Sequence, residues 1–380
     1  SFLFKNNKII LTFVALFVIF ISYLLLPTFY IQSDISKELK NELQRKFDLN
    51  FKFSQNIKYN FFPKPHFTTT DTTIIHNQKE TSKISKLKVF ISFDNFFSIK
   101  NLEAKNLIIE NANFNLNTNN YSFFIDLLNK NFKDGNLIIK DSNIFFRHLD
   151  NEVLFISKIF KIKYYYDPKE FKNIFYSQNE IFNIPFSFES FLGEDKNKIF
   201  SLININLMKL KIQNELSLNN KNKIGQAHFT LNKLKRIIEY RIEKNSFNFN
   251  LFDKINQPNI FYQGKFNFKP FYANLDGNSD QIDLNYIFGS NALIAQLLKT
   301  EIFNNKNIDF KLNITADSVY GNANFKNISL NSKIQEGLID TDKTKFEWRD
   351  IASFEVIESL IFIKNGELVL DGKLKIFVND

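Results

Sequence analysis

The segment Ile308-Asp309-Phe310-Lys311-Leu312-Asn313-Ile314-Thr315 decides the fold class of this chain. Apolar and polar residues alternate along it, and a period of two is typical of a β-strand with one buried face. The same alternation appears in Phe247-Asn248-Phe249-Asn250-Leu251 and in Leu374-Lys375-Ile376-Phe377-Val378. The chain is therefore predicted to be mainly β, with one apolar face and one face of Asn, Lys and Thr.

Turn signals containing Asn, Asp and Gly are expected to separate these runs. They are Lys133-Asp134-Gly135-Asn136, Leu275-Asp276-Gly277-Asn278, Lys364-Asn365-Gly366-Glu367 and Leu370-Asp371-Gly372-Lys373. The helical candidates in this part of the chain are few: residues 122–130, 232–243 and 291–303. Three short helices cannot cover a sheet built from about 300 residues. The apolar face must therefore bury itself against its own curvature or take a cover from outside.

An apolar run near the N-terminus predicts a membrane anchor. Residues 9–33 contain no charged side chain, and a spanning helix needs about 20 apolar residues. Tyr23 and Tyr30 stand where interfacial aromatic residues are enriched, and Pro27 lies near the far end. A cleaved signal peptide is the alternative, but the run exceeds the usual ~7–15 apolar residues and no A-x-A-like site follows it. We expect residues 1–33 to form a cytoplasmic stub and a transmembrane anchor.

A short amphipathic helix is predicted directly after the anchor, over residues 34–48. Its apolar positions recur every four residues: Ile35, Leu39, Leu43 and Phe47. Asp34 stands where a helix N-cap would be. The helix could rest on the membrane or cover the end of the sheet, and we expect the second, because an apolar sheet end needs a cover. Residues 49–380 are then one β-rich domain, since no linker rich in Gly, Ser or Pro divides them.

Composition narrows the function further. The 380 residues include 47 Phe and no Cys, so the chain forms neither disulfides nor thiolate metal sites. A net charge of +9 raises the question of nucleic acid. Lys and Asp or Glu are interleaved along the chain rather than clustered, however. A solvated lysine-rich face accounts for this charge better, and no nucleic-acid partner is expected.

The sequence lacks the residue patterns of common catalytic and metal sites. The four histidines are scattered, without HExxH or i,i+4 spacing: His66, His76, His148 and His228. GxGxxG, GxxxxGK[ST] and GxSxG do not occur. We therefore expect no enzyme activity, no metal and no cofactor.

Two regions of the chain resemble the AsmA family, envelope proteins of Gram-negative bacteria. In the first, up to about residue 148, the resemblance lies in the order of elements: anchor, short helix, strand and the turn Phe61-Phe62-Pro63-Lys64-Pro65-His66-Phe67. Segments 84–97, 102–114 and 135–145 follow, around the predicted helix at 122–130. The second region, residues 282–372, is similar to the C-terminal portion of the family through NITADSVYGNANFKNISLNSKIQEGLI and GELVLDGKLKI. Residues 164–281 depart most from the family.

The resemblance implies a single-pass protein of the bacterial inner membrane whose bulk lies in the periplasm. It also implies membership of the repeating β-groove proteins that are thought to carry phospholipids between membranes. The uncovered apolar face favours the same inference, because an elongated, curled antiparallel sheet leaves a trough that fits hydrocarbon chains. About 18 strands at ~4.8 Å spacing make a sheet of roughly 85 Å, which is shorter than a periplasm is wide. A periplasmic or outer-membrane partner protein, a relay of molecules or a further C-terminal portion of the chain is therefore expected.

Nine residues of the alternating runs are the candidate lipid-facing positions: Phe247, Phe249, Leu251, Phe266, Phe268, Ile308, Phe310, Leu312 and Ile314. The first hypothesis is an anchored protein whose apolar β-groove binds or conducts phospholipid acyl chains, supporting outer-membrane lipid homeostasis and biogenesis. In the alternative, the same residues are the core of a closed sheet, and the protein is a structural or assembly factor for outer-membrane protein insertion that binds no lipid.

Overall fold

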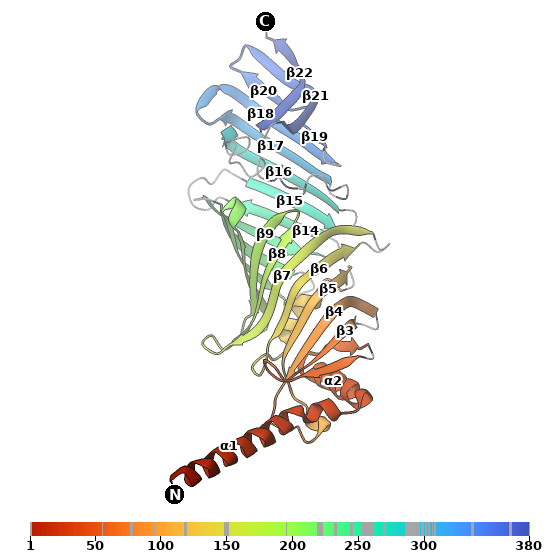
Figure 1. The fold of residues 1–380 in the computed structure, drawn as a ribbon. Helices are drawn as coiled ribbons and strands as arrows, with labels where there is room; N and C mark the ends of the chain where they lie inside the picture. Colours follow the sequence, from red (N-terminus) through yellow and green to blue (C-terminus); the bar gives the residue numbers. More distant parts are fainter. Residues whose placement is uncertain are drawn as a thin grey trace. The chain divides into compact units, whose positions relative to one another are not determined.

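The fold is mainly β, as the alternation predicts. The computed structural model describes the chain except residues 1, 55, 77–78, 95, 118–119, 148–151, 195, 219–222, 232–233, 244–245, 253–260, 269–270, 286–296, 298–299, 301, 303–304, 306, 308, 336–337, 365–366 and 380. Strands hold 64% of the residues, in a large curled sheet of 22 strands, so the predicted fold class is confirmed (Figure 1). Its contacts divide the chain into two compact units, Ser1–Asn179 and Glu180–Asp380, here called unit 1 and unit 2.

Unit 1 begins with the predicted apolar helix. Helix α1 (Phe2–Leu25) continues into the 3-10 turn η1 (Leu26–Phe29). The window Ile10–Phe29 has 20 residues and is long and apolar enough to cross a membrane. Only 6% of this window is buried, so most of its side chains are free to face lipid.

Helix α2 (Gln32–Phe47) is the amphipathic helix predicted for residues 34–48. It begins two residues earlier than expected, with Ile31 at the N-cap position, so the prediction that Asp34 caps the helix is wrong. Asp34 lies in the first turn instead, where its carboxylate interacts favourably with the positive end of the helix dipole. The N-cap position has no side-chain hydrogen bond.

Helix α2 covers the sheet of unit 1, which confirms that part of the prediction. Leu39, Leu43 and Phe47 are 0% exposed. Two polar side chains of the helix also bond the sheet: Glu42 accepts a hydrogen bond from the Ala104 N–H at 3.0 Å, and the Lys46 Nζ donates to the Ala104 carbonyl at 2.5 Å. The helix therefore combines a dry apolar contact with hydrogen bonds that satisfy backbone groups at the end of a strand.

The strands of unit 1 are β1 (Asn50–Lys52), β2 (Ile57–Asn60), β3 (His66–His76), β4 (Lys79–Ile91), β5 (Ala104–Leu116), β6 (Leu137–Arg147), β7 (Val153–Asp167) and β8 (Lys172–Ile181), the last running two residues past the boundary between the units. Both β1 and β2 pair with β3, and β3–β4, β4–β5 and β6–β7 are antiparallel. Strands β5 and β6 are parallel. The 3-10 turn η2 (Ile99–Asn101) precedes β5, and the β5–β6 connection holds α3 (Phe123–Asp126) and η3 (Leu127–Asn129). These last two confirm the helix predicted at 122–130.

The strands of unit 2 are β9 (Ile184–Leu192), β10 (Lys198–Ile205), β11 (Leu210–Ser217), β12 (Lys223–Leu231), β13 (Leu234–Ile242), β14 (Ser246–Phe252), β15 (Phe261–Phe268), β16 (Phe271–Ile282), β17 (Asp309–Val319), β18 (Asn322–Gln335), β19 (Leu338–Asp340), β20 (Lys345–Trp348), β21 (Ala352–Lys364) and β22 (Glu367–Val378). A one-turn 3-10 helix, η4 (Asn206–Met208), joins β10 to β11. Strands β9 to β16 form an antiparallel meander. Strand β18 then pairs with β19 and β20, which both pair with β21.

The sheet is not wholly antiparallel, which corrects one part of the prediction. Strands β5–β6 and β16–β17 are parallel pairs. In each case a long connection, residues 117–136 or 283–308, returns the chain to the end at which the previous strand began. A parallel pair needs a crossover of about a dozen residues or more, and period-two alternation carries no information on strand direction.

Three other predictions differ from the structure. Residues 234–242 form β13 rather than part of a helix, because pairing with β12 and β14 along both edges outweighs the helical spacing of Leu234, Ile237 and Ile238.

The expected turns at 275–278 and 370–373 lie inside β16 and β22. The turn at 133–136 is present, and β21 and β22 form a hairpin in which Lys364 pairs with Glu367. The helix expected at 291–303 lies largely outside the described residues.

Replacing Leu43 by Ala should lower the free energy of unfolding by about 2–5 kcal/mol, because it leaves a cavity between α2 and the sheet of unit 1. The exposed Lys40 of the same helix is the matched control, and Lys40→Ala should change that free energy by less than ~0.5 kcal/mol. Denaturant unfolding of both variants measures the difference. Equal effects would show that α2 does not seal the sheet.

Tyr59 of β2 makes the stability of unit 1 depend on pH in the alkaline range. Its hydroxyl donates a hydrogen bond to the Leu24 carbonyl at 2.7 Å. Burial, with a smaller contribution from Tyr30, raises the pKa of Tyr59 to about 12 from its ordinary value of 10.0. The fold therefore favours the neutral phenol, and this stabilisation is complete below pH 10.0 and is lost as the pH rises towards about 12.

The loss of stability between pH about 9 and pH about 12 should be smaller in Tyr59→Phe than in the unaltered chain. The variant has no phenol to ionise at this position, while all other tyrosines and lysines titrate in both proteins. Thermal unfolding at the two pH values measures the difference in Tm. An equal drop in both proteins would contradict the role given to Tyr59.

Candidate functional site

Strands β14 and β15 bring four of the predicted lipid-facing residues together: Phe247, Phe249, Leu251 and Phe266. Phe247 lies opposite Phe266 in the antiparallel register, with ring centroids 6.1 Å apart. The ring of Phe249 stacks on that of Phe266 at 5.9 Å. Tyr240 of β13, which sequence reasoning missed, adds a ring 4.9 Å from Phe247. Together these rings form an aromatic cluster across three strands.

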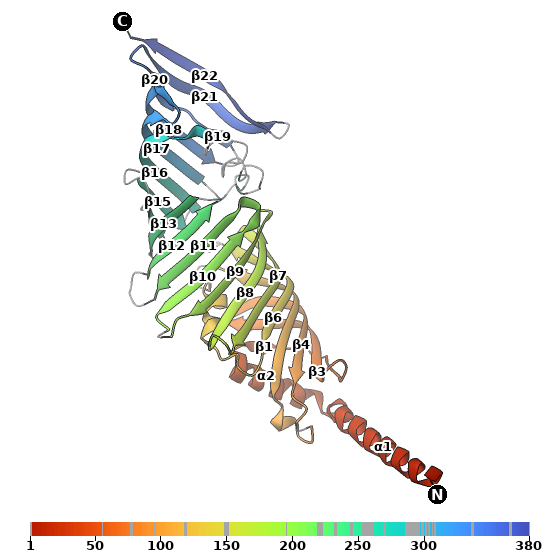
Figure 2. The same ribbon diagram turned by 90° about the vertical axis from the view of Figure 1, so that its left-hand side faces the viewer.

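The register continues this face through β16, β17 and β18, as three rows of residues that each cross five strands. The first row is Phe247, Phe266, Ala273, Phe310 and Ile334; the second is Phe249, Gly264, Leu275, Leu312 and Ser332; the third is Leu251, Tyr262, Gly277, Ile314 and Leu330. We call these residues the three-row face. Figure 2 shows β15 to β18 following one another along unit 2.

For two of the nine predicted positions the structure describes no side chain. Phe268 is at the end of β15 and pairs with Phe271, but its side chain is outside the described residues. Ile308 is outside them altogether. The other seven predicted residues, from β14, β15 and β17, all belong to the three-row face.

The three-row face is more open than the sheet of unit 1. Most of its described side chains are partly buried, and its three buried members, Ala273, Ile314 and Ile334, are 4–6% exposed, against 0% for Leu107 and Phe114 in unit 1. The described side chains packed around Ile282 and Ile314 come from strands. In the described part of unit 2, the helical residues are η4 (Asn206–Met208) and residues 284–285 and 297.

Glycines let three aromatic rings lie flat across neighbouring strands. A Cβ atom at Gly264 would stand 2.2 Å from the Phe249 ring, which occupies that space in the register opposite it. The same relation holds for Gly225 with Tyr240 and for Gly277 with Tyr262. A ring that lies on the backbone of the next strand stays low above the sheet. The expected turn at 275–278 is absent for this reason: Gly277 makes room for a ring and continues the strand.

Polar groups on the three-row face are few. The rows contain no charged side chain, and Ser332, Tyr262 and the glycines are their only members that are not alkyl or phenyl residues. Next to the rows, the Tyr240 hydroxyl donates to the Asn214 Oδ1 at 2.6 Å. On the opposite side of β16 and β17, the Asn313 Nδ2 donates to the Asp276 Oδ1 at 2.7 Å. The sheet therefore separates an apolar side from a hydrogen-bonded polar side.

Burial also shifts the pKa of two tyrosines, Tyr262 on the three-row face and Tyr240 beside it. It raises the pKa of Tyr262, and it raises the pKa of Tyr240 against the lowering effect of the hydrogen bond with Asn214. Both phenols are therefore neutral near pH 7. The surface offers hydrocarbon contact, without a group that would act as an acid, a base or a nucleophile at that pH.

In the described part of the chain, no group of three His, Cys, Asp or Glu side chains is arranged so that it could hold a metal ion. The side chain of His66 makes a hydrogen bond and a stacking contact. Its Nδ1 lies 2.8 Å from the Lys64 carbonyl oxygen, and its ring stacks on that of Phe90 at 4.9 Å. The expectation of a non-enzymatic protein without metal or cofactor stays a prediction.

No protein-family description matches this chain, and no curated protein matches it. The resemblance to the AsmA family therefore stays a prediction that rests on the sequence segments quoted for it.

Replacing Gly264 by Ala tests whether the space above the rings is open. The new methyl group displaces the Phe249 ring, and on an open face the ring can swing upwards at a cost below ~1 kcal/mol, whereas overpacking a closed core costs about 1–3 kcal/mol. Ala112→Val in the sealed sheet of unit 1, where Ala112 is 0% exposed, provides the closed reference. Denaturant unfolding compares the two, and equal costs would show that the three-row face is closed.

Proposed function

We propose that the three-row face of unit 2 binds lipid acyl chains and that the protein is a membrane-anchored, lipid-binding protein without enzyme activity. The observation that supports this most is the contrast between the units. Helix α2 buries Leu39, Leu43 and Phe47 completely against unit 1, whereas the Phe and Leu side chains described on the three-row face of unit 2 are only partly buried. Apolar surface left in water costs about 25 cal/mol per Å², so such a face favours an apolar occupant.

The chemistry of the face fits a hydrocarbon chain. An acyl chain requires no hydrogen bonds, and the three rows contain no charged group. Five strands at ~4.8 Å spacing give rows of roughly 20 Å, comparable with the ~15 Å of hydrocarbon in one leaflet of a bilayer. The rings that lie flat over Gly264 and Gly277 leave volume above the sheet for such a chain. A charged headgroup would lie beyond the rows.

The proposed setting of this activity comes from α1 and from the sequence resemblance. Helix α1 is apolar enough to hold the protein in a membrane, which supplies both a location and a source of lipid. The resemblance to the AsmA family supports the inner membrane of a Gram-negative bacterium, with the body in the periplasm. It further supports membrane phospholipids as the ligand, a periplasmic or outer-membrane protein as partner, and a role in outer-membrane lipid homeostasis and biogenesis.

The test is mass spectrometry of lipids that co-purify with residues 32–380, which keep α2 whole and lack the anchor and the lipid around it. We expect phospholipid to remain bound through purification. Phe310→Asp and Leu312→Asp should each reduce the bound phospholipid, while circular dichroism shows the fold retained, because a carboxylate on an open face stays hydrated.

The matched control is Lys311→Asp, which places the same carboxylate on the opposite, exposed side of β17 and should leave the bound lipid unchanged. Loss of the fold in Phe310→Asp and Leu312→Asp would reveal a closed core, since an unpaired buried carboxylate costs several kcal/mol. A soluble, monomeric and lipid-free body would favour the alternative, an assembly factor for outer-membrane protein insertion. An intact fold with undiminished lipid would place the lipid elsewhere.

A further inference from the structure

Exposed apolar side chains cluster where α1 meets the rest of unit 1. They are Phe29, Ile31, Phe61, Phe62, Phe93 and Phe97, with exposed fractions between 44% and 82%. They come from three separate segments: the end of η1, the turn after β2 and the loop after β4. Surface aromatics that occur singly need no explanation, but a cluster drawn from separate segments marks an interaction surface.

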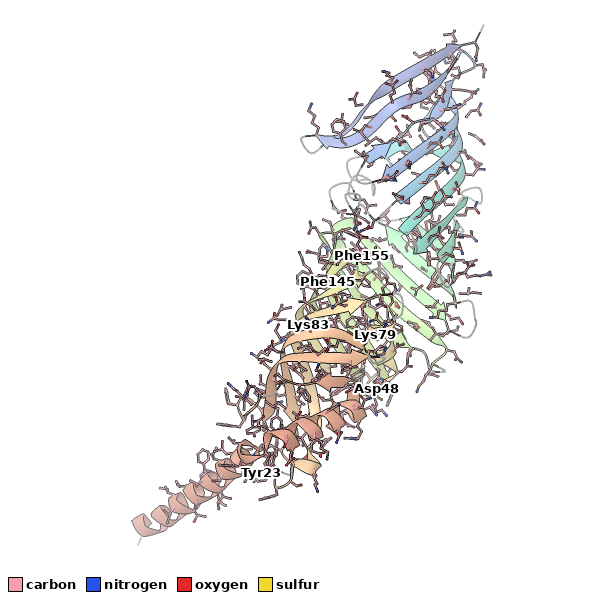
Figure 3. All side chains as sticks on the ribbon, turned by 90° about the vertical axis from the view of Figure 1, so that its right-hand side faces the viewer. Tyr23, Asp48, Lys79, Lys83, Phe145 and Phe155 are labelled. Atoms are coloured by element: carbon pink, nitrogen blue, oxygen red, sulfur yellow. The ribbon has the colours of Figure 1, made fainter. Side chains whose placement is uncertain are left out.

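The loop after β4 is fixed to the apolar helix through Tyr23, which Figure 3 labels at the junction of the helix and the sheet. The Tyr23 hydroxyl donates to the Phe93 carbonyl at 2.8 Å and accepts from the Phe96 N–H at 2.9 Å. Its ring lies 5.4 Å from that of Phe96 and 5.2 Å from that of Phe97. The Tyr30 hydroxyl also donates to the Phe96 carbonyl. These contacts therefore fix the position of the loop after β4 along α1.

The turn after β2 is fixed to the same level of the helix. The Tyr59 hydroxyl bonds the carbonyl of Leu24 at 2.7 Å, and Tyr59 also packs edge-on against Phe96 at 6.3 Å. Phe61 and Phe62 follow Tyr59 within three residues. The loop after β4, and Tyr59 at the end of β2 just before the turn, are thus bonded to adjacent residues of one helical turn.

That turn of helix lies inside the apolar window. Tyr23 and Leu24 belong to Ile10–Phe29, and the distance from Tyr23 to the end of the window is roughly 10 Å along the axis. When α1 crosses a bilayer, residues bonded to Tyr23 and Leu24 lie at the level of the membrane interface. Aromatic side chains are favoured at that depth. The exposed Lys64 and Lys100 lie next to these aromatics in sequence and outnumber the exposed Asp94 beside Phe93, so the charge here favours contact with anionic headgroups.

We propose that the turn at 61–64 and the loop at 93–100 insert into the membrane interface beside α1. Unit 1 is then seated on the bilayer through three points, and the partner of this surface is lipid of the leaflet at which α1 enters unit 1. The loops act independently of the three-row face, so this inference does not rest on lipid binding by unit 2.

The absence of cysteine from the sequence permits a test on the full chain with single labelling sites. Phe62→Cys and Phe97→Cys are labelled with an environment-sensitive fluorophore and placed in nanodiscs of phosphatidylethanolamine and phosphatidylglycerol. Both side chains are largely exposed, so the substitutions leave the core intact. We expect quenching by a nitroxide on the upper part of the lipid chain, and protection from iodide in the water.

Two further sites calibrate the measurement. Leu16→Cys on α1 sets the signal of the bilayer interior, and Phe160→Cys, at an exposed position of β7, sets the signal of water. If either Phe62→Cys or Phe97→Cys behaves like Phe160→Cys, with iodide quenching and no nitroxide quenching, the proposal is overturned. That result would also be obtained if the aromatics served a protein partner, because no such partner is present in the nanodisc.

Discussion

Period-two alternation gives each strand an apolar side, and the free energy of hydrating that side governs the rest of the structure. In unit 1 the solution is an amphipathic helix. Leu39, Leu43 and Phe47 of α2 are withdrawn from water completely, and Glu42 and Lys46 bond the backbone at Ala104. Because the helix satisfies both hydrocarbon and backbone hydrogen bonds, the strands behind it can form a dry core.

The connection between the parallel strands of unit 1 completes that core. Phe123, Phe124, Leu127 and Leu128 are all buried, and the Phe124 ring lies 5.2 Å from that of Phe114 on β5. Tyr164 of β7 is fully buried and donates its hydroxyl to the Phe124 carbonyl at 2.6 Å, and burial raises its pKa well above the ordinary value. Unit 2 has a parallel pair too, but most of its connection, residues 283–308, is outside the described residues. What the described part shows there is a face made by strands, with flat rings and mostly partly buried side chains.

Apolar surface thus occurs in three different settings in this chain. The window Ile10–Phe29 is long and apolar enough to cross a bilayer, the exposed aromatics around Tyr23 are proposed to lie at its interface, and the three-row face is proposed to bind a hydrocarbon chain. The tyrosine hydroxyls near these surfaces form hydrogen bonds within the protein. Those of Tyr23, Tyr30 and Tyr59 donate to loop or helix carbonyls, and that of Tyr240 donates to Asn214. The hydroxyls therefore fix the geometry while the rings provide the apolar contact.

The sequence by itself determined what depends on neighbouring residues: the apolar window at the N-terminus, the amphipathic α2, the mainly β fold and the membership of Phe247, Phe249, Phe310 and Leu312 in one apolar side of their strands. Alternation and helical spacing are local properties, so they can be read directly from the order of residues. Only the tertiary structure decided which strands are parallel and that residues 234–242 form a strand rather than a helix. It also decided that Gly264 and Gly277 make room for aromatic rings, the second in place of the expected turn. Each of these depends on a partner strand brought alongside by the fold. Pairing between Ala273 and Phe310, across a connection of many residues, joins the predicted residues into one surface, and no local pattern specifies such a register.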